Sequence, residues 1–254
     1  MIVKNSDNGK PPMVLLHGWG LNSGVWDFVL PQLEQLFDVH RIDLPGFGFN
    51  NHKQLDRYDL IGLAELIAPL CPAGSVLAGW SLGGLVASQL ALQYPGHFSS
   101  LCLIASTPCF VEQKSWKGIK PQVLNSFAKA LCDDSEKTVA RFLAIQAMGS
   151  ASAREDVKWL KQAVITGGSP KAEALSGGLA ILQQIDLRPQ LATLTIPIKG
   201  IYGRLDSLVA VESVSKLADS LADFEYQVLH QASHAPFISH RDEFIDALKQ
   251  MYSL

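Results

Sequence analysis

The hexapeptide Gly79-Trp80-Ser81-Leu82-Gly83-Gly84 decides the fold. The apolar run at 75–78 before it is typical of a short buried strand, and segment 85–92 after it is typical of a helix. A serine at such a junction takes a strained backbone conformation that holds its hydroxyl clear of the sheet, and the flanking glycines let strand and helix approach closely. The stretch therefore predicts a serine nucleophile; the alternative is a glycine-rich helix start that only packs tightly.

Strands and helices alternate on both sides of this turn. The apolar spacing predicts further strands at 13–16, 39–42, 101–105, 196–202 and 224–229, and further helices at 25–37, 60–67, 211–221 and 243–251. Such alternation indicates an α/β fold with a mostly parallel sheet covered on both faces. The dozen residues before the first of these strands leave room for one short edge strand, so we expect about seven strands.

The alternation stops near Cys109 and resumes at Ile196. Four helices and no strand are predicted between them, at 123–131, 137–148, 153–165 and 172–185. We interpret residues 111–185 as a helical lid inserted into a core domain of residues 1–110 and 186–254. The lid has ten Lys or Arg against seven Asp or Glu, whereas the remainder has eleven against seventeen, so a basic lid covers an acidic core.

Composition limits the classes of function. With 254 residues, 48% of them hydrophobic, and a net charge of −3, the chain can form one large core and has no overall attraction for nucleic acid. The N-terminal residues contain no apolar signal segment, and no apolar run approaches the roughly 18 residues of a membrane span. A cytoplasmic protein that does not enter membranes is expected. The cysteines are scattered and no set of ligands has zinc spacing, so neither a metal nor a cofactor is expected.

Two further polar residues follow predicted strands, where the reacting groups of parallel sheets gather. Asp206 lies in the loop after 196–202, and His234 lies after 224–229. A serine hydroxyl needs a base to accept its proton, and a carboxylate on the far ring nitrogen fixes the tautomer of that base. Ser81, Asp206 and His234 occur in the order that is typical of an α/β-hydrolase.

Other interpretations of these two residues remain open. Asp206 could cap the helix that begins near Val211, and His234 could be a buried structural histidine. His230 and His240 are rival bases, although both are expected at the surface.

The turn His17-Gly18-Trp19 follows the predicted strand at 13–16. Its main chain can therefore direct an N–H toward the reacting carbonyl, and we expect the N–H groups of Trp19 and Leu82 to form an oxyanion hole. The Trp19 side chain could instead be simple core filler. His17 is expected to brace the loops rather than to take protons.

The lid carries two pairs of basic residues at helical spacing: Lys137 with Arg141, and Arg154 with Lys158. Each pair shares a helical face, which is either an ordinary solvated surface or a docking surface for an acidic partner. Apolar residues of the same helices could line an acyl tunnel, with packing between lid and sheet as the alternative.

These residues give the chain a resemblance to a known family, the pimeloyl-[acyl-carrier protein] methyl ester esterases of biotin synthesis, within the α/β-hydrolase superfamily. The core segments that carry it are His17-Gly18-Trp19-Gly20-Leu21-Asn22, Asp43-Leu44-Pro45-Gly46-Phe47-Gly48, residues 79–88 and His234-Ala235-Pro236-Phe237-Ile238-Ser239-His240. Those at the start of the lid and within it are Pro108-Cys109-Phe110, Gly118-Ile119-Lys120-Pro121, Arg141-Phe142-Leu143-Ala144 and Gly177-Gly178-Leu179. Lid segments vary most among hydrolases, so these matches are the specific ones.

The resemblance implies an α/β-hydrolase that cleaves the methyl ester of a pimeloyl chain borne on acyl carrier protein. It implies Ser81 as nucleophile, His234 as base and Asp206 as the residue that orients the base, with Trp19 and Leu82 contacting the substrate oxygen. It further implies an acyl site made by Phe142, Leu143, Ala144, Ile145 and Gln146. Carrier-protein docking would involve Lys137, Arg141, Arg154 and Lys158.

Two departures from the family pattern affect these expectations. Lys137 and Lys158 stand where arginine is expected, which keeps the charge but loses bidentate phosphate binding. Asn50 replaces a serine that is common in related hydrolases. The chain is expected to act as a monomer. The alternatives are a generalist short-chain carboxylesterase or a thioesterase and, from another class, a non-catalytic ligand receptor on the same fold.

Overall fold

One seven-stranded sheet runs through the part of the chain that the computed structural model describes, which is residue 1 and residues 3–254. Its order is β1-β3-β2-β4-β5-β6-β7. The strands are β1 (Val3–Asn5), β2 (Pro12–Leu16), β3 (Asp38–Ile42), β4 (Ser75–Trp80), β5 (Phe98–Ile104), β6 (Ile198–Gly203) and β7 (Phe224–Leu229). Strand β1 runs antiparallel to β3, whereas all other neighbours are parallel. The predicted mostly parallel sheet with one short N-terminal edge strand is confirmed.

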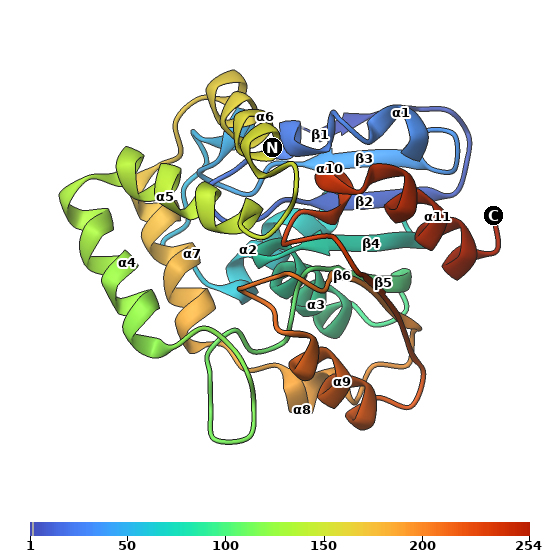
Figure 1. Ribbon diagram of the computed structural model, residues 1–254. Helices are drawn as coiled ribbons and strands as arrows, with labels where there is room; N and C mark the ends of the chain where they lie inside the picture. Colours follow the sequence, from blue (N-terminus) through green and yellow to red (C-terminus); the bar gives the residue numbers. More distant parts are fainter. Residues whose placement is uncertain (2) are drawn as a thin grey trace.

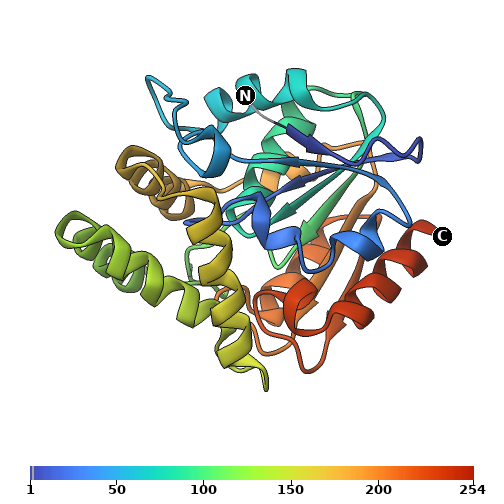
Figure 2. The same cartoon turned by 90° about the horizontal axis from the view of Figure 1, so that it is seen from above.

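Helices cover both faces of the sheet, and Figure 2 shows α2 and α3 on one face with α1 and α11 on the other. The α-helices outside the lid are α1 (Leu30–Leu33), α2 (Leu60–Ile67), α3 (Leu82–Gln93), α8 (Arg188–Leu191), α9 (Val211–Ser220), α10 (Pro236–Ser239) and α11 (Arg241–Tyr252). Short 3₁₀ turns are η1 (Ser23–Trp26), η2 (Gly48–Asn50) and η3 (Ala68–Leu70). All residues of β4 are buried, as expected for a central strand covered on both faces. Among the described helices, none combines the length and the apolar character that crossing a bilayer requires.

Of the five helices between β5 and β6, four lie together beyond one end of the strands (Figure 1). They are α4 (Pro121–Asp133), α5 (Ser135–Ala147), α6 (Ala153–Gly167) and α7 (Ala172–Gln184). They occupy the segments in which the apolar spacing predicts helices. The division into a core of 1–110 and 186–254 and a lid of 111–185 stays a prediction about domains.

The helix predicted over 25–37 is wrong in its extent. The chain forms η1, a turn over residues 27–29, and then only the four-residue helix α1. Pro31 stands in the first turn of α1. Proline lacks an N–H and disfavours helical geometry in the residue before it, so it can open a helix but cannot continue one.

The strand order places one point of the sheet at a topological switch. The chain passes from β2 to β3 on one side and then returns to β4 on the other side of β2. In open parallel sheets a crevice forms at the carboxyl ends of two such strands. His17 follows β2 and Ser81 follows β4, so both predicted loops lie at this crevice.

Candidate active site

Ser81 occupies the sharp turn between β4 and α3. Its φ of 55° and ψ of −120° are unusual for a residue with a side chain, and a conformation of this kind costs about 1–3 kcal/mol. A Cβ at Gly79 would lie 2.2 Å from the Gly83 oxygen, and a Cβ at Gly83 would lie 2.4 Å from the Leu16 oxygen. Only glycine therefore fits at either position. The crowding of strand, turn and helix keeps Ser81 in its strained geometry.

Asp206 and His234 form a buried pair at the ends of β6 and β7. His234 Nδ1 lies 2.8 Å from Asp206 Oδ2, and both side chains are fully buried. Asp206 Oδ1 accepts hydrogen bonds from the N–H groups of Leu208 at 2.8 Å and Val209 at 3.0 Å. Asp206 does not cap α9, because the residue at that cap is Ala210. The carboxylate instead uses Oδ1 to fix its own loop and Oδ2 to fix the imidazole.

His234 is fixed at every hydrogen-bonding atom except Nε2. Its N–H donates to the Gln146 oxygen at 3.2 Å, and its own oxygen accepts from Trp80 Nε1 at 2.7 Å. Because Asp206 Oδ2 is an acceptor, Nδ1 carries the proton and Nε2 carries a lone pair. Nε2 is buried without a hydrogen-bond partner among the described residues. Such an atom is available to accept a proton, and catalytic hydrogen bonds often form only when substrate binds.

The loop after β2 lies directly against the serine turn. A Cβ at Gly18 would be 3.1 Å from Trp80 Cε3 and 3.3 Å from Ser81 Cβ. His17 Nε2 accepts from the Leu44 N–H at 3.0 Å, and its Nδ1 donates to the Gly18 oxygen at 2.8 Å. Burial lowers the pKa of His17, so the ring is neutral and serves as a brace between loops.

The two expected oxyanion donors border this arrangement. Leu82 is the first residue of α3, so its N–H is one of those that a helix leaves without an intrahelical acceptor. The Trp19 indole donates to the Leu175 oxygen of α7 at 2.8 Å, and its ring centroid lies 4.9 Å from that of Phe142 on α5. A Cβ at Gly178 would lie 2.9 Å from Trp19 Cδ1. Helices α5 and α7 therefore pack directly against the loop that carries Trp19, called the oxyanion loop below after its expected role.

The segment Phe142 to Gln146 does not present all of its side chains inward. Phe142, Leu143 and Gln146 are buried, whereas Ala144 is exposed and Ile145 is half-buried. Five consecutive residues of an α-helix cannot face one side, and positions i, i+1 and i+4 share the inner face. Three of the five residues are therefore candidates for contact with an acyl chain through their side chains.

The Gln146 amide is buried with neither its Nε2 nor its Oε1 hydrogen-bonded in the described residues. We expect Gln146→Met, which preserves the approximate volume, to raise the free energy of unfolding by about 1–3 kcal/mol, because it removes an unsatisfied buried polar group. Urea denaturation of the two proteins measures the difference. Gln162→Met on the exposed face of α6 is the matched control and should change little. A Gln146→Met protein less stable than the wild type would contradict the expectation.

Two residues of the site have no sequence prediction. Ser106 Oγ donates to the Ser81 oxygen at 2.7 Å, while the Ser81 N–H donates to the Ile104 oxygen at 3.1 Å. Ser106 lies two residues after the last residue of β5, so its place at the carboxyl end of a strand is a signal that could have found it. Trp80 gives no such signal, because nothing in the sequence shows that its indole meets a residue more than 150 positions away.

Neither rival base forms a hydrogen bond to Asp206 among the described residues. His230 is exposed, and His240 is half-buried with its Nδ1 bonded to Ser239. Asn50 is buried and donates to the Asp43 oxygen at 2.8 Å, so the loop that carries it is hydrogen-bonded despite the departure from serine. Within residue 1 and residues 3–254, no cluster of three His, Cys, Asp or Glu could hold a metal ion.

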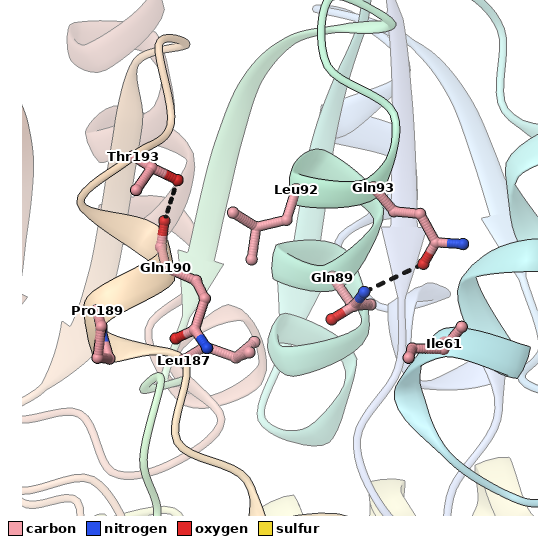
Figure 3. Close-up of a pocket in the computed structure, with 8 residues that line it drawn as sticks. All are labelled: Ile61, Gln89, Leu92, Gln93, Leu187, Pro189, Gln190 and Thr193. Atoms are coloured by element: carbon pink, nitrogen blue, oxygen red, sulfur yellow. Dashed lines mark hydrogen bonds between the residues drawn. The ribbon is translucent and has the colours of Figure 1, made fainter.

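An open groove of about 590 Å³ lies between α2, α3 and α8 (Figure 3). It is lined by Ile61, Gln89, Leu92, Gln93, Leu187, Pro189, Gln190 and Thr193. None of these side chains titrates, and the bonds drawn there join Gln89 to Gln93 and Thr193 to Gln190. The groove therefore lacks the groups that acid–base chemistry requires.

The four basic residues predicted for docking are all exposed. Lys137 and Arg141 lie on α5, and Arg154 and Lys158 lie on α6, which packs against α5. The Arg141 guanidinium sits 5.4 Å from the centre of the Phe127 ring. Each of the two neighbouring helices therefore presents two exposed basic side chains to solvent.

Comparisons with known proteins agree with this geometry. The model of a family described as alpha/beta hydrolase fold matches residues 11–241. A pimeloyl-[acyl-carrier protein] methyl ester esterase of Pseudoalteromonas atlantica is 49% identical over 236 residues, which cover 92% of each chain. The protein of the same name from Klebsiella pneumoniae is 47% identical over 94% of this chain and 93% of its own.

Solved structures show the same fold at much lower identity. An esterase from Exiguobacterium antarcticum superposes with a TM-score of 0.86 at 20% identity, over 99% of this chain and 95% of its own. A bromoperoxidase from Bacillus anthracis gives 0.84 at 20% identity, over the same shares of the two chains. The chain therefore belongs to the α/β hydrolase fold family and, within it, to the family of pimeloyl-[acyl-carrier protein] methyl ester esterases.

Proposed function

We propose that this chain is a serine carboxylesterase that hydrolyses the methyl ester of pimeloyl-[acyl-carrier protein], the substrate in its relatives' names, as a step of biotin synthesis. The observation that carries the proposal is the buried Asp206–His234 pair, whose free Nε2 lies in a loop bonded to the residue before Ser81. Relatives of that name match the lid as well as the core, since the identity extends over more than nine-tenths of the chain. We further propose a monomeric, cytoplasmic enzyme that acts without nucleic acid or membrane.

In the acylation step, Ser81 Oγ attacks the ester carbonyl while His234 Nε2 takes the hydroxyl proton. Charge builds on the carbonyl oxygen, where the N–H groups of Trp19 and Leu82 would donate hydrogen bonds. The C–O bond to the methoxy group then breaks, and the imidazolium gives its proton to the departing methanol. The Asp206 carboxylate stabilises the imidazolium and holds its orientation throughout.

Deacylation repeats these steps with water. His234 Nε2 takes a proton from the water molecule as its oxygen attacks the acyl-serine carbonyl. The bond to Ser81 Oγ breaks, and the imidazolium returns the proton to Oγ. The products are the free distal carboxylate and the regenerated serine.

The lid offers a route for a carrier-borne substrate. A cleft of about 500 Å³ lies between α5 and α6, and its walls include Val139, Leu143 and Leu175. Leu175 supplies the oxygen that holds the Trp19 indole. Lys161 and Glu136 line the same cleft, and the helices that form it carry the four exposed basic residues. An acidic carrier protein on this face would present its acyl arm to an apolar passage that leads toward the oxyanion loop.

Charge reversal tests this docking. We expect the double variant Arg141→Glu/Arg154→Glu to raise KM for the carrier-borne ester on the order of tenfold, because rim charges that attract the partner become repulsive. Hydrolysis of a small free ester should not change, and the difference should shrink as salt is added. Lys129→Glu, an exposed lysine on α4, is the matched control. An equal loss on both substrates would count against docking on this face.

The choice of substrate tests the function itself. Purified enzyme would be assayed on the pimeloyl-carrier methyl ester, on its shorter and longer homologues, and on free p-nitrophenyl esters. Equal preference for all of them would favour a generalist carboxylesterase or a thioesterase. Failure to form a covalent adduct with a serine-directed phosphonate would favour a non-catalytic receptor.

A further inference from the structure

We infer that Trp80 is a positioning residue of the hydrolytic site. Its indole fixes the loop that carries His234 (the histidine loop) relative to the turn at Ser81 (the serine turn) and to the oxyanion loop. This inference rests on the proposed serine-hydrolase function. Trp80 ends β4 and precedes the nucleophile, so its main chain is already part of the turn. Its side chain is fully buried and takes part in two further contacts of that site.

The first contact is with the histidine loop. Trp80 Nε1 donates to the His234 oxygen at 2.7 Å, which is a short hydrogen bond for a neutral N–H donor. The indole also lies beside the imidazole, with ring centroids 5.7 Å apart, and edge-on to Phe237 at 5.0 Å. This hydrogen bond therefore joins the residue before the nucleophile to the residue that carries the base.

The second contact is with the oxyanion loop. Trp80 Cε3 lies 3.1 Å from the position that a Cβ on Gly18 would take, so the indole edge fills the space that the glycine leaves open. Gly18 directly precedes Trp19, the expected oxyanion donor. One side chain thus touches both loops that must meet around Ser81.

Loss of the Nε1 bond would free one specific atom of His234. The N–H of that residue is held by Gln146 and its Nδ1 by Asp206, so the main-chain oxygen is the third anchor of the ring's position. With that anchor removed, the peptide can rotate and carry Nε2 away from Ser81. A misplacement of about 1 Å can cost about 10²-fold in rate.

Trp26 is a matched control within the same aromatic cluster. It is fully buried, its ring lies 6.4 Å from that of Trp80 and 4.3 Å from that of Phe237. Its Nε1 has no hydrogen-bond partner in the described residues. Replacing Trp26 with Phe therefore removes the same indole N–H from the same cluster without breaking a bond to His234.

The test compares Trp80→Phe with Trp26→Phe on p-nitrophenyl acetate and on a serine-directed phosphonate. We expect Trp80→Phe to lower kcat and the rate of phosphonate labelling by about 10- to 100-fold, with KM within about twofold of wild type. Trp26→Phe should stay within about twofold of wild type in kcat, KM and labelling rate. Unchanged kcat in Trp80→Phe, or equal losses in the two variants, would overturn the inference.

A second variant tests the same inference if Trp80→Phe does not fold. Incorporation of 3-benzothienylalanine at position 80 keeps the bicyclic shape and replaces only the N–H by sulfur, and the same loss of kcat is expected. Wild-type kcat in this variant would overturn the inference. The failure of the proposed function looks different, because the wild-type enzyme itself would then neither hydrolyse esters nor react with the phosphonate.

Discussion

The Ser81→Ala variant is expected to lose ester hydrolysis by a factor of about 10⁵ or more while keeping its fold. Alanine has no oxygen to form the acyl intermediate, so the remaining groups can only bind substrate and polarise its carbonyl. The bonds that hold the turn use the main-chain N–H and oxygen of Ser81, not its hydroxyl. Single-turnover assays measure the loss, and circular dichroism checks the fold. Carrier-protein binding should also persist, and retained turnover would remove Ser81 from the mechanism.

Ser81→Gly is the matched partner of that variant. Both changes delete the hydroxyl, but glycine adopts a φ of 55° without a steric cost, whereas alanine keeps the strain of the serine. We expect the glycine variant to have a free energy of unfolding about 1 kcal/mol higher than the alanine variant, and both to be inactive. Equal stabilities would show that the turn stores no strain at this residue.

The Asp206→Asn variant is expected to lose about 10⁴-fold in kcat, because the histidine would be held in the wrong tautomer. The hydrogen-bond donors of the surrounding loop determine the orientation of the new side-chain amide. Its oxygen must face the N–H groups of Leu208 and Val209, which leaves the amide NH₂ directed at His234 Nδ1. A donor at that place favours the tautomer with the proton on Nε2, which then cannot accept one from Ser81.

The control for this prediction is Asp219→Asn, which makes the same chemical change on the exposed side of α9. It should leave kcat within about twofold of wild type, since isolated surface charges contribute little. Steady-state kinetics on a small ester compares the three proteins and avoids any effect on docking. If Asp206→Asn kept most of its activity, the carboxylate would have no part in orienting the base.

The sheet and its order of elements were predictable because strand, turn and helix each leave a local pattern. Segment 224–229 alternates with period two, and the glycines around Ser81 mark the place where backbones touch. The helix over 25–37 could not be delimited in the same way, since its apolar spacing runs across the whole segment although the α-helix begins only at Leu30 and ends at Leu33. Periodicity describes which side chains are buried, not whether hydrogen bonding continues along the chain.

The site was predictable where chain order and strand ends decide it, and not where packing does. Asp206 and His234 follow consecutive strands, so their meeting could be expected from the sheet alone. The roles of Trp80 and Ser106 depend on which atoms happen to face them across the turn. The exposure of Ala144 depends on the rotation of α5 about its own axis, which the sequence of this segment does not determine.

The hydrogen bond from the Trp19 indole to the Leu175 oxygen ties the position of the Trp19 loop to the position of α7. A displacement of α7 would therefore remove the anchor of Trp19 and also free the loop whose N–H is expected to receive the oxyanion.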